Sequence, residues 1–117
     1  MESYMDIKKD HIDGTDILNE QLKSIPVDVV SLNFEGAEIT DKGISNLPFL
    51  HCIKSLNVSN TLITEKSLKV IATFTTLEKL WMSNIKSNDV YSLDTLINLN
   101  FLDFGNSETE FIDYLPK

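Results

Sequence analysis

Two hydrophobic patterns alternate along the chain. Each of four segments begins with apolar residues at its first, fourth and sixth positions, as at Val29, Leu32 and Phe34. Positions four and six of an extended segment point to the same side, so this spacing predicts a short strand with one buried face. Later in each segment the apolar spacing changes to about three, as at Ile44 and Leu47, which predicts a helix packed behind the strand.

The alternation repeats along the chain. Residues 29–44 align with residues 53–68 at an offset of 24, and nearly every apolar position matches. The pattern restarts at Leu77, in a unit that is two residues shorter between Ile85 and Val90, and restarts again at Leu99. These segments are called units one to four below, starting at residues 29, 53, 77 and 99.

A hydroxyl and an acid stand between strand and helix in the first two units. Thr40 and Thr64 are placed to cap the first free helical amides, and Asp41 and Glu65 to complement the helix dipole. In the third unit the residues that could take the capping place are Ser87, Asn88 and Asp89.

Together these residues follow the pattern L-x-x-L-x-L-x-x-[C/T/A]-x-I-T-[D/E]-x-[G/S]-L, which resembles a leucine-rich repeat over residues 29–106. The resemblance implies an α/β fold: a short solenoid of about three to four strand–helix repeats with parallel strands on its concave face. It also implies that partners bind on that concave face.

The flanking segments fit the two ends of such a stack, which need caps. We expect residues 1–28 to form an N-terminal arm and a capping helix, residues 29–106 the repeats, and residues 107–117 a C-terminal cap or tail. The helix is predicted over residues 16–25, after Thr15 as its cap and before Pro26 as its stop. Its apolar face consists of Ile17, Leu18, Leu22 and Ile25.

Composition narrows the classes of partner. Ten basic and eighteen acidic residues give a net charge of −8, which would repel nucleic acid and anionic lipid. The N-terminus lacks the features of a secretory signal, and no apolar run has the length of a membrane span. The single cysteine, Cys52, favours a reducing compartment, so we expect a cytoplasmic protein. We also expect a monomer.

Residues with catalytic chemistry are few, and they do not form a set of nucleophile, base and orienting group. We expect Cys52 to be buried and structural, His51 to be a surface histidine, and Asp10, His11 and Asp13 to form a solvated charge cluster rather than a metal site. The four glycines stand singly, so there is no phosphate-binding loop. We therefore predict no enzyme activity, no cofactor and no metal.

The open face of the strands is the remaining place for a function. Side chains at positions three, five and seven of each unit point away from the core. Trp81 and Phe101 then stand on neighbouring strands with their rings toward solvent, an aromatic centre with a polar rim. The alternative is that the C-terminal tail covers Trp81. The predicted partner-binding residues are Asn33, Glu35, Asn57, Lys79, Trp81, Phe101 and Asp103.

The sequence therefore favours a non-catalytic module that binds another protein through the strand face. A compact acidic chain would suit an inhibitor or immunity protein that neutralises a basic toxin or nuclease, because negative potential speeds capture of a positive partner. The alternative is a scaffold or adaptor protein of the same family with no toxin partner.

Overall fold

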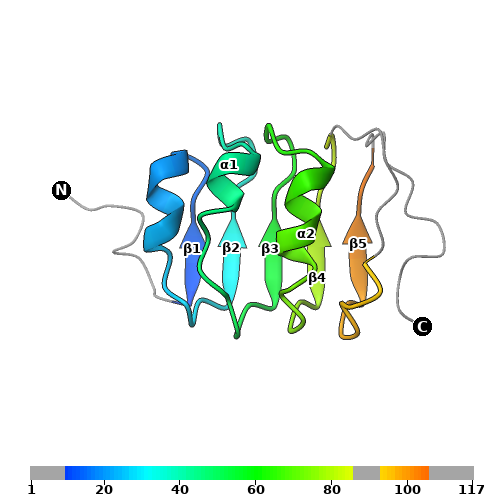
Figure 1. Cartoon of the computed structure of the whole chain (residues 1–117). Helices are drawn as coiled ribbons and strands as arrows, with labels where there is room; N and C mark the ends of the chain where they lie inside the picture. The colour runs from blue at the N-terminus through cyan, green and yellow to red at the C-terminus, as the bar shows by residue number, and fades with distance from the viewer. Residues whose placement is uncertain (1–9, 86–92, 106–117) are drawn as a thin grey trace.

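The computed structural model describes residues 10–85 and 93–105. Its centre is a parallel sheet of five short strands, which lie side by side in their order along the chain (Figure 1). This arrangement confirms the predicted α/β class. The strands are β1 (His11–Asp13), β2 (Ser31–Asn33), β3 (Ser55–Asn57), β4 (Lys79–Trp81) and β5 (Phe101–Asp103).

The register of the sheet follows the spacing of the sequence units. Leu32 of β2 pairs with Leu56 of β3, Leu56 pairs with Leu80 of β4, and each partner is 24 residues further along the chain. Leu80 pairs with Leu102 of β5 after 22 residues, because the third unit is two residues shorter. Leu32, Leu56 and Leu80 are almost fully buried, so the predicted inward face is confirmed.

Strand β1 was not expected, because the sequence assigned its residues to an arm before the capping helix. His11–Asp13 pairs with Ser31–Asn33 in parallel, and Ile12 is buried in the core. The predicted charge cluster around His11 therefore lies on an edge strand, where Asp10, His11 and Asp13 are exposed. The residue two positions after Ile12 is Gly14, so β1 lacks the second apolar residue that shows alternation in the other strands, and it is recognised only from its pairing.

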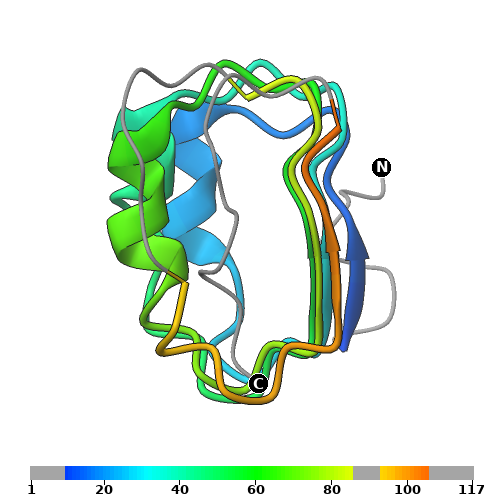
Figure 2. The same ribbon diagram turned by 90° about the vertical axis from the view of Figure 1, so that its right-hand side faces the viewer.

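Short helical segments cover one face of the sheet, and the opposite face carries no helix within the described residues (Figure 2). Each segment has only one or two turns. Apolar residues at intervals of three are connected mainly by tight turns, in which an N–H donates to the carbonyl three residues earlier. Leu47 N donates to Ile44 O, and Leu99 N donates to Leu96 O in this way. The segments are η2 (Asn19–Ser24), α1 (Asp41–Ile44), η3 (Glu65–Ser67) and α2 (Leu68–Ile71).

The helix predicted over residues 16–25 is shorter than expected. It is the 3-10 helix η2, which begins at Asn19, so Thr15 is not its cap. Ile17, Leu22 and Ile25 are buried as predicted, but Leu18 is 47% exposed. The prediction for Leu18 was wrong because Leu18 precedes the helix and has an extended backbone (φ −107°, ψ 156°), so it does not share the helical face of Leu22.

The turn after each strand shows the same periodicity in the backbone. Gly36, Asn60 and Asn84 follow one another at 24-residue intervals, and all three have positive φ, at 75°, 58° and 60°. Glycine and asparagine are the residues that adopt this left-handed conformation most readily. The three turns are also joined, since Asn84 Nδ2 donates to Asn60 Oδ1 and Asn60 Nδ2 donates to Glu35 Oε2.

Asp41 connects two successive units and does not serve only its own helix. Its carboxylate accepts hydrogen bonds from the Thr64 backbone amide, the Thr64 hydroxyl and the Ser67 hydroxyl, all 23 or 26 residues further along the chain. Asn19 does the same one unit earlier, where its Oδ1 accepts from Thr40 N. The Thr40 hydroxyl makes no capping bond to α1, contrary to the prediction.

The apolar core runs the length of the sheet between the strands and the helical segments. Within residues 10–85 and 93–105, no helix has the length and apolar character needed to cross a membrane. The candidate caps Ser87, Asn88 and Asp89, and the predicted C-terminal cap or tail at residues 107–117, lie outside the described residues.

Candidate functional site

The face of the sheet opposite the helices carries two rows of side chains, one from the first and one from the third residue of each strand. The pairing register sets these rows across all five strands. The first row consists of His11, Ser31, Ser55, Lys79 and Phe101. The second row consists of Asp13, Asn33, Asn57, Trp81 and Asp103.

Four residues of the second row are bound to the backbone of their own strand end. Asn33 Oδ1 accepts from the Glu35 amide and Asn57 Oδ1 accepts from the Ser59 amide. Asp13 and Asp103 make the same contact two residues ahead. This local turn satisfies an amide where the strand ends, and asparagine and aspartate are the residues that form it. These four side chains therefore stabilise the ends of their strands.

Trp81 is the exception in the second row, because an indole cannot accept a hydrogen bond from the amide two residues ahead. The amide of Ser83 donates instead to Ser59 Oγ of the neighbouring unit, at 2.9 Å. Ser59 is itself buried, at 5% exposure. A hydroxyl from the preceding unit thus replaces the missing acceptor, and the backbone does not need an aromatic residue at position 81.

Replacing Ser59 by alanine is therefore expected to lower the free energy of unfolding by about 1–2 kcal/mol, because the half-buried Ser83 amide loses its acceptor. Ser55→Ala is the matched control: the same change in a half-buried side chain with no hydrogen bond to the described residues. Urea denaturation of both variants measures the difference. Equal losses in the two variants would contradict the assigned role of Ser59.

Trp81 and Phe101 form an aromatic pair across β4 and β5, as the sequence predicted. Their ring centroids are 5.1 Å apart and the rings are tilted by 48°. This separation lies within the range of favourable aromatic contacts. Phe101 is 42% exposed and Trp81 is half-buried. Two large rings thus stand together on a face whose neighbouring strands β2 and β3 carry only serine and asparagine.

Charged residues flank the pair on both strands. Lys79 lies directly opposite Phe101, and Asp103 lies directly opposite Trp81. Asn57 is the neighbour of Trp81 on the other side, in β3. The structure therefore brings Asn57, Lys79 and Asp103 next to the aromatic pair, as predicted from the alternation of the strands.

Asn33 and Glu35 lie further from the aromatic pair. Both belong to the β2 part of the sheet, two strands from Trp81 and so about 10 Å away at the usual spacing of strands. Glu35 is exposed in the turn after β2 and contacts Asn60. They share the open face with Trp81 and do not border the ring.

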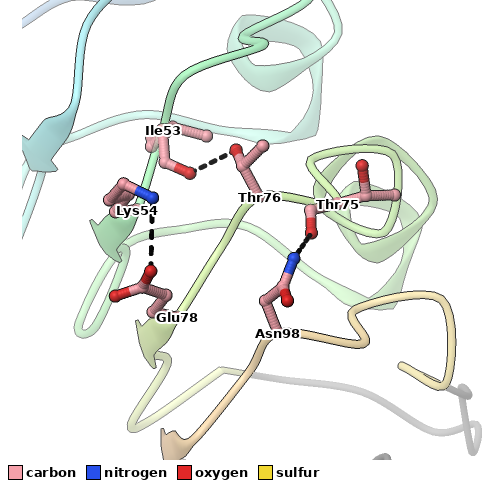
Figure 3. Close-up of polar contacts among 6 residues, drawn as sticks. All are labelled: Ile53, Lys54, Thr75, Thr76, Glu78 and Asn98. Atoms are coloured by element: carbon pink, nitrogen blue, oxygen red, sulfur yellow. Dashed lines mark hydrogen bonds and ion pairs between the residues drawn. The ribbon is translucent and has the colours of Figure 1, made fainter.

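The edge of the sheet where the strands begin is held by contacts between successive units (Figure 3). The Thr76 hydroxyl donates to Ile53 O, and Asn98 Nδ2 donates to Thr75 O. Lys54 and Glu78 form an ion pair of 3.2 Å between these two units. These three contacts each join one unit to the next at this edge.

Cys52 is less buried than predicted. It is half-buried, and its Sγ lies 3.2 Å from Nδ1 of the adjacent His51, whose ring is exposed. The prediction rested on the usual burial of free cysteine. Cys52 lies in the bend before β3, where the first inward position is taken by Ile53.

Among the described residues, no three side chains of histidine, cysteine, aspartate or glutamate come together as metal ligands would. Asp10 and His11 approach to 3.8 Å on the edge strand, with both side chains exposed. The two residues are therefore an exposed pair of neighbours in the sequence.

In comparisons with known proteins, no family model, no curated protein and no solved structure matches this chain. The site is therefore described by its own geometry. It is an aromatic pair of half-buried Trp81 and exposed Phe101, bordered by one cation and one carboxylate, on the sheet face that carries no helix among the described residues.

Proposed function

We propose that this chain is a short leucine-rich-repeat solenoid that binds another protein through the open face of its sheet and catalyses no reaction. The 24-residue register of β2, β3 and β4 supports the repeat. Parallel pairing of consecutive strands is the geometry in which stacked repeats bury a continuous core. Segment η2, which packs against α1, is the proposed N-terminal helical cap.

The aromatic pair is the observation that carries the proposed binding function. At the position of Trp81 the other four strands carry an asparagine or aspartate that binds the backbone. Tryptophan gives up that bond and leaves part of a large apolar ring on the surface beside exposed Phe101. Exposed aromatic residues surrounded by polar groups are the common anchors of protein interfaces.

A more specific form of this proposal is that the chain is an inhibitor or immunity protein that neutralises a basic toxin or nuclease. It is supported by the net charge of −8 and by the carboxylates of Asp13, Glu35 and Asp103 on the open side. The single cysteine supports a location in the cytoplasm. A scaffold or adaptor protein with the same binding face is the alternative, and the chemistry of the captured partner separates the two.

The test replaces the aromatic pair with the residues that β2 and β3 carry at the same register, in the double variant Trp81→Asn, Phe101→Ser. Asn33 and Asn57 show that asparagine at this position binds the backbone, so the variant should fold. We expect affinity capture from source cells to lose the partner, with affinity reduced at least about thirtyfold, the effect of removing a central interface anchor.

The control variant is Phe49→Ser, Ile97→Ser, which removes two apolar side chains that are 61% and 71% exposed and lie outside the sheet. It should retain the partner. Circular dichroism and denaturation establish that both variants are folded. A partner that survives the sheet-face variant and is lost in the control would overturn the proposed binding face.

The identity of the partner then decides between the two forms of the proposal. A stoichiometric basic protein, captured less efficiently as salt is raised, supports the inhibitor form because steering by opposite charges is screened by salt. A neutral or acidic partner, bound independently of salt, supports the scaffold or adaptor form.

A further inference from the structure

We propose that the partner anchors itself on this face with an arginine, whose guanidinium stacks on the Trp81 ring and binds the Asp103 carboxylate. This inference rests on the proposed function and names the chemistry that the aromatic pair would recognise. It follows from the second carboxylate oxygen of Asp103 and the ring of Trp81, and the charge of Lys79 on the same face supplies a test.

One carboxylate oxygen of Asp103 has no hydrogen-bond partner among the described residues. Its Oδ1 accepts from the Gly105 amide at 3.0 Å, whereas its other oxygen accepts no hydrogen bond from any described residue. The bond to Gly105 fixes the carboxyl group beside the end of β5. Asp103 pairs with Trp81, and paired strands lie about 4.8 Å apart, so this second oxygen and the indole border the same small area.

The indole supplies the second contact. Tryptophan is the aromatic side chain that attracts cations most strongly, through the negative face of its ring. The ring centroids of Phe101 and Trp81 are 5.1 Å apart, so Phe101 limits the orientations that the indole can take. A planar guanidinium can stack on a ring and present its N–H groups to a carboxylate at the same time, which a lysine ammonium cannot do as well.

The charge of the surroundings favours a cation over a second copy of this chain. Asp13, Glu35 and Asp103 are acidic on or beside the open face, and Lys79 is the single lysine among the strand residues there. Two such faces brought together would place like charges opposite each other, which is unfavourable. A basic side chain of another protein meets the opposite charge.

The positive charge of Lys79 would repel an arginine bound at Trp81, so changing Lys79 tests whether the bound group is a cation. Lys79 projects from the same face of β4 as Trp81, and it makes no ion pair with a described residue. Removing its charge should strengthen the binding of a cation at Trp81, and removing the charge of Asp103 should weaken it. An acidic or neutral ligand at the same place would reverse or abolish both effects.

The experiment uses the fluorescence of Trp81, which is the only tryptophan of the chain. The full chain is titrated with a five-residue glycine peptide that has one central arginine. Two analogues carry lysine or the uncharged arginine isostere citrulline at the centre. We expect a saturable fluorescence change with the arginine peptide, weaker binding of the lysine peptide, and no saturable change with citrulline.

Three variants then assign the site. Asp103→Asn should weaken the affinity for the arginine peptide by about threefold to fivefold, the size of an exposed charge contact. Lys79→Ser, the residue that β2 and β3 carry at this register, should strengthen it by about twofold. Asp28→Asn removes one exposed acidic charge away from the sheet face and should leave the affinity unchanged.

Each other outcome contradicts the arginine anchor. Equal binding of the citrulline peptide would show that charge is not recognised, and equal effects of Asp103→Asn and Asp28→Asn would show only a response to net charge. A dimer in sedimentation velocity that disappears in Trp81→Asn would make a second copy the occupant. If the Trp81→Asn, Phe101→Ser variant loses the partner and Asp103→Asn retains it fully, the proposed function stands and the arginine anchor is wrong.

Discussion

Replacing Phe34 by alanine is expected to lower the free energy of unfolding by about 3–5 kcal/mol, the largest stability effect of any substitution considered for this chain. Phe34 is fully buried in the turn after β2. Its ring packs so closely on the backbone at Gly14 that a Cβ there would lie 2.7 Å from two ring carbons. Truncation leaves a cavity beside the Gly14 backbone, because the surroundings of a buried ring relax only partly.

Phe49→Ala makes the same chemical change at a residue that is 61% exposed, and it should shift stability by no more than about 0.5 kcal/mol. Urea denaturation of the two variants, followed by circular dichroism, measures the difference between them. Folded domains of this kind have a total stability of about 5–15 kcal/mol, so Phe34→Ala should populate the unfolded state measurably at elevated temperature. A loss below about 1.5 kcal/mol for Phe34→Ala would show that the first unit is not packed as described.

Replacing Asp41 by alanine is expected to cost about 2–3 kcal/mol, although its side chain is only partly buried. Three donors of the next unit, the Thr64 amide, the Thr64 hydroxyl and the Ser67 hydroxyl, lose their acceptor. The distances are 2.8, 2.6 and 2.6 Å, and Ser67 is 1% exposed, so water cannot readily replace the carboxylate there.

Glu65→Ala is the matched control for Asp41→Ala. Glu65 occupies the position equivalent to Asp41 one unit later, and its carboxylate makes no hydrogen bond to a described residue. Its removal should change stability by no more than about 0.5 kcal/mol. Equal costs at the two positions would show that the acid acts on its own helix dipole, as the sequence alone predicted, and not across units.

The Asp41 carboxyl also makes the free energy of unfolding depend on pH. Partial burial raises the pKa of Asp41, but the hydrogen bonds from Ser67 and Thr64, together with the charge of Lys66, outweigh it and hold the pKa below its usual value. A carboxyl with a lowered pKa in the folded state contributes stability above its ordinary pKa of about 3.9 and loses it as the pH falls through the folded value.

Comparison with Asp41→Asn isolates this contribution. The advantage of the wild type over the variant should be constant near neutral pH and should shrink as the pH is lowered below about 4. Thermal denaturation between about pH 7 and pH 2.5 covers the transition. An advantage that stays constant to the acid limit would contradict the lowered pKa.

The sequence predicted the elements that depend on short-range periodicity. The alternation at Leu32 and Phe34 identified the buried face of β2, and the 24-residue offset transferred that assignment to the later strands. Because the side chains of a strand alternate strictly, the outward positions followed from the inward ones. The pairing of Trp81 and Phe101 on the open face was predictable for this reason.

Contacts between units were not predictable, because each depends on which residues 20 to 26 positions apart come within hydrogen-bonding distance. Strand β1 exists through its pairing with β2, and the assignment of its residues to an arm missed it. The binding of Thr64 by Asp41 and the replacement of a missing acceptor by Ser59 are of the same kind. A column of asparagine and aspartate at the fifth position was visible in the sequence, but its capping role was not recognised.

The sequence by itself determined the α/β class, the positions of β2 to β5 and the two faces of the sheet, since these follow from local spacing and from the burial of apolar side chains. Only the tertiary structure decided that four polar residues of the second row bind their own backbone and that Trp81 does not. The physical reason is that a hydrogen bond requires atoms to meet within about 3 Å, and this distance is set by how neighbouring units stack, not by the order of residues within one.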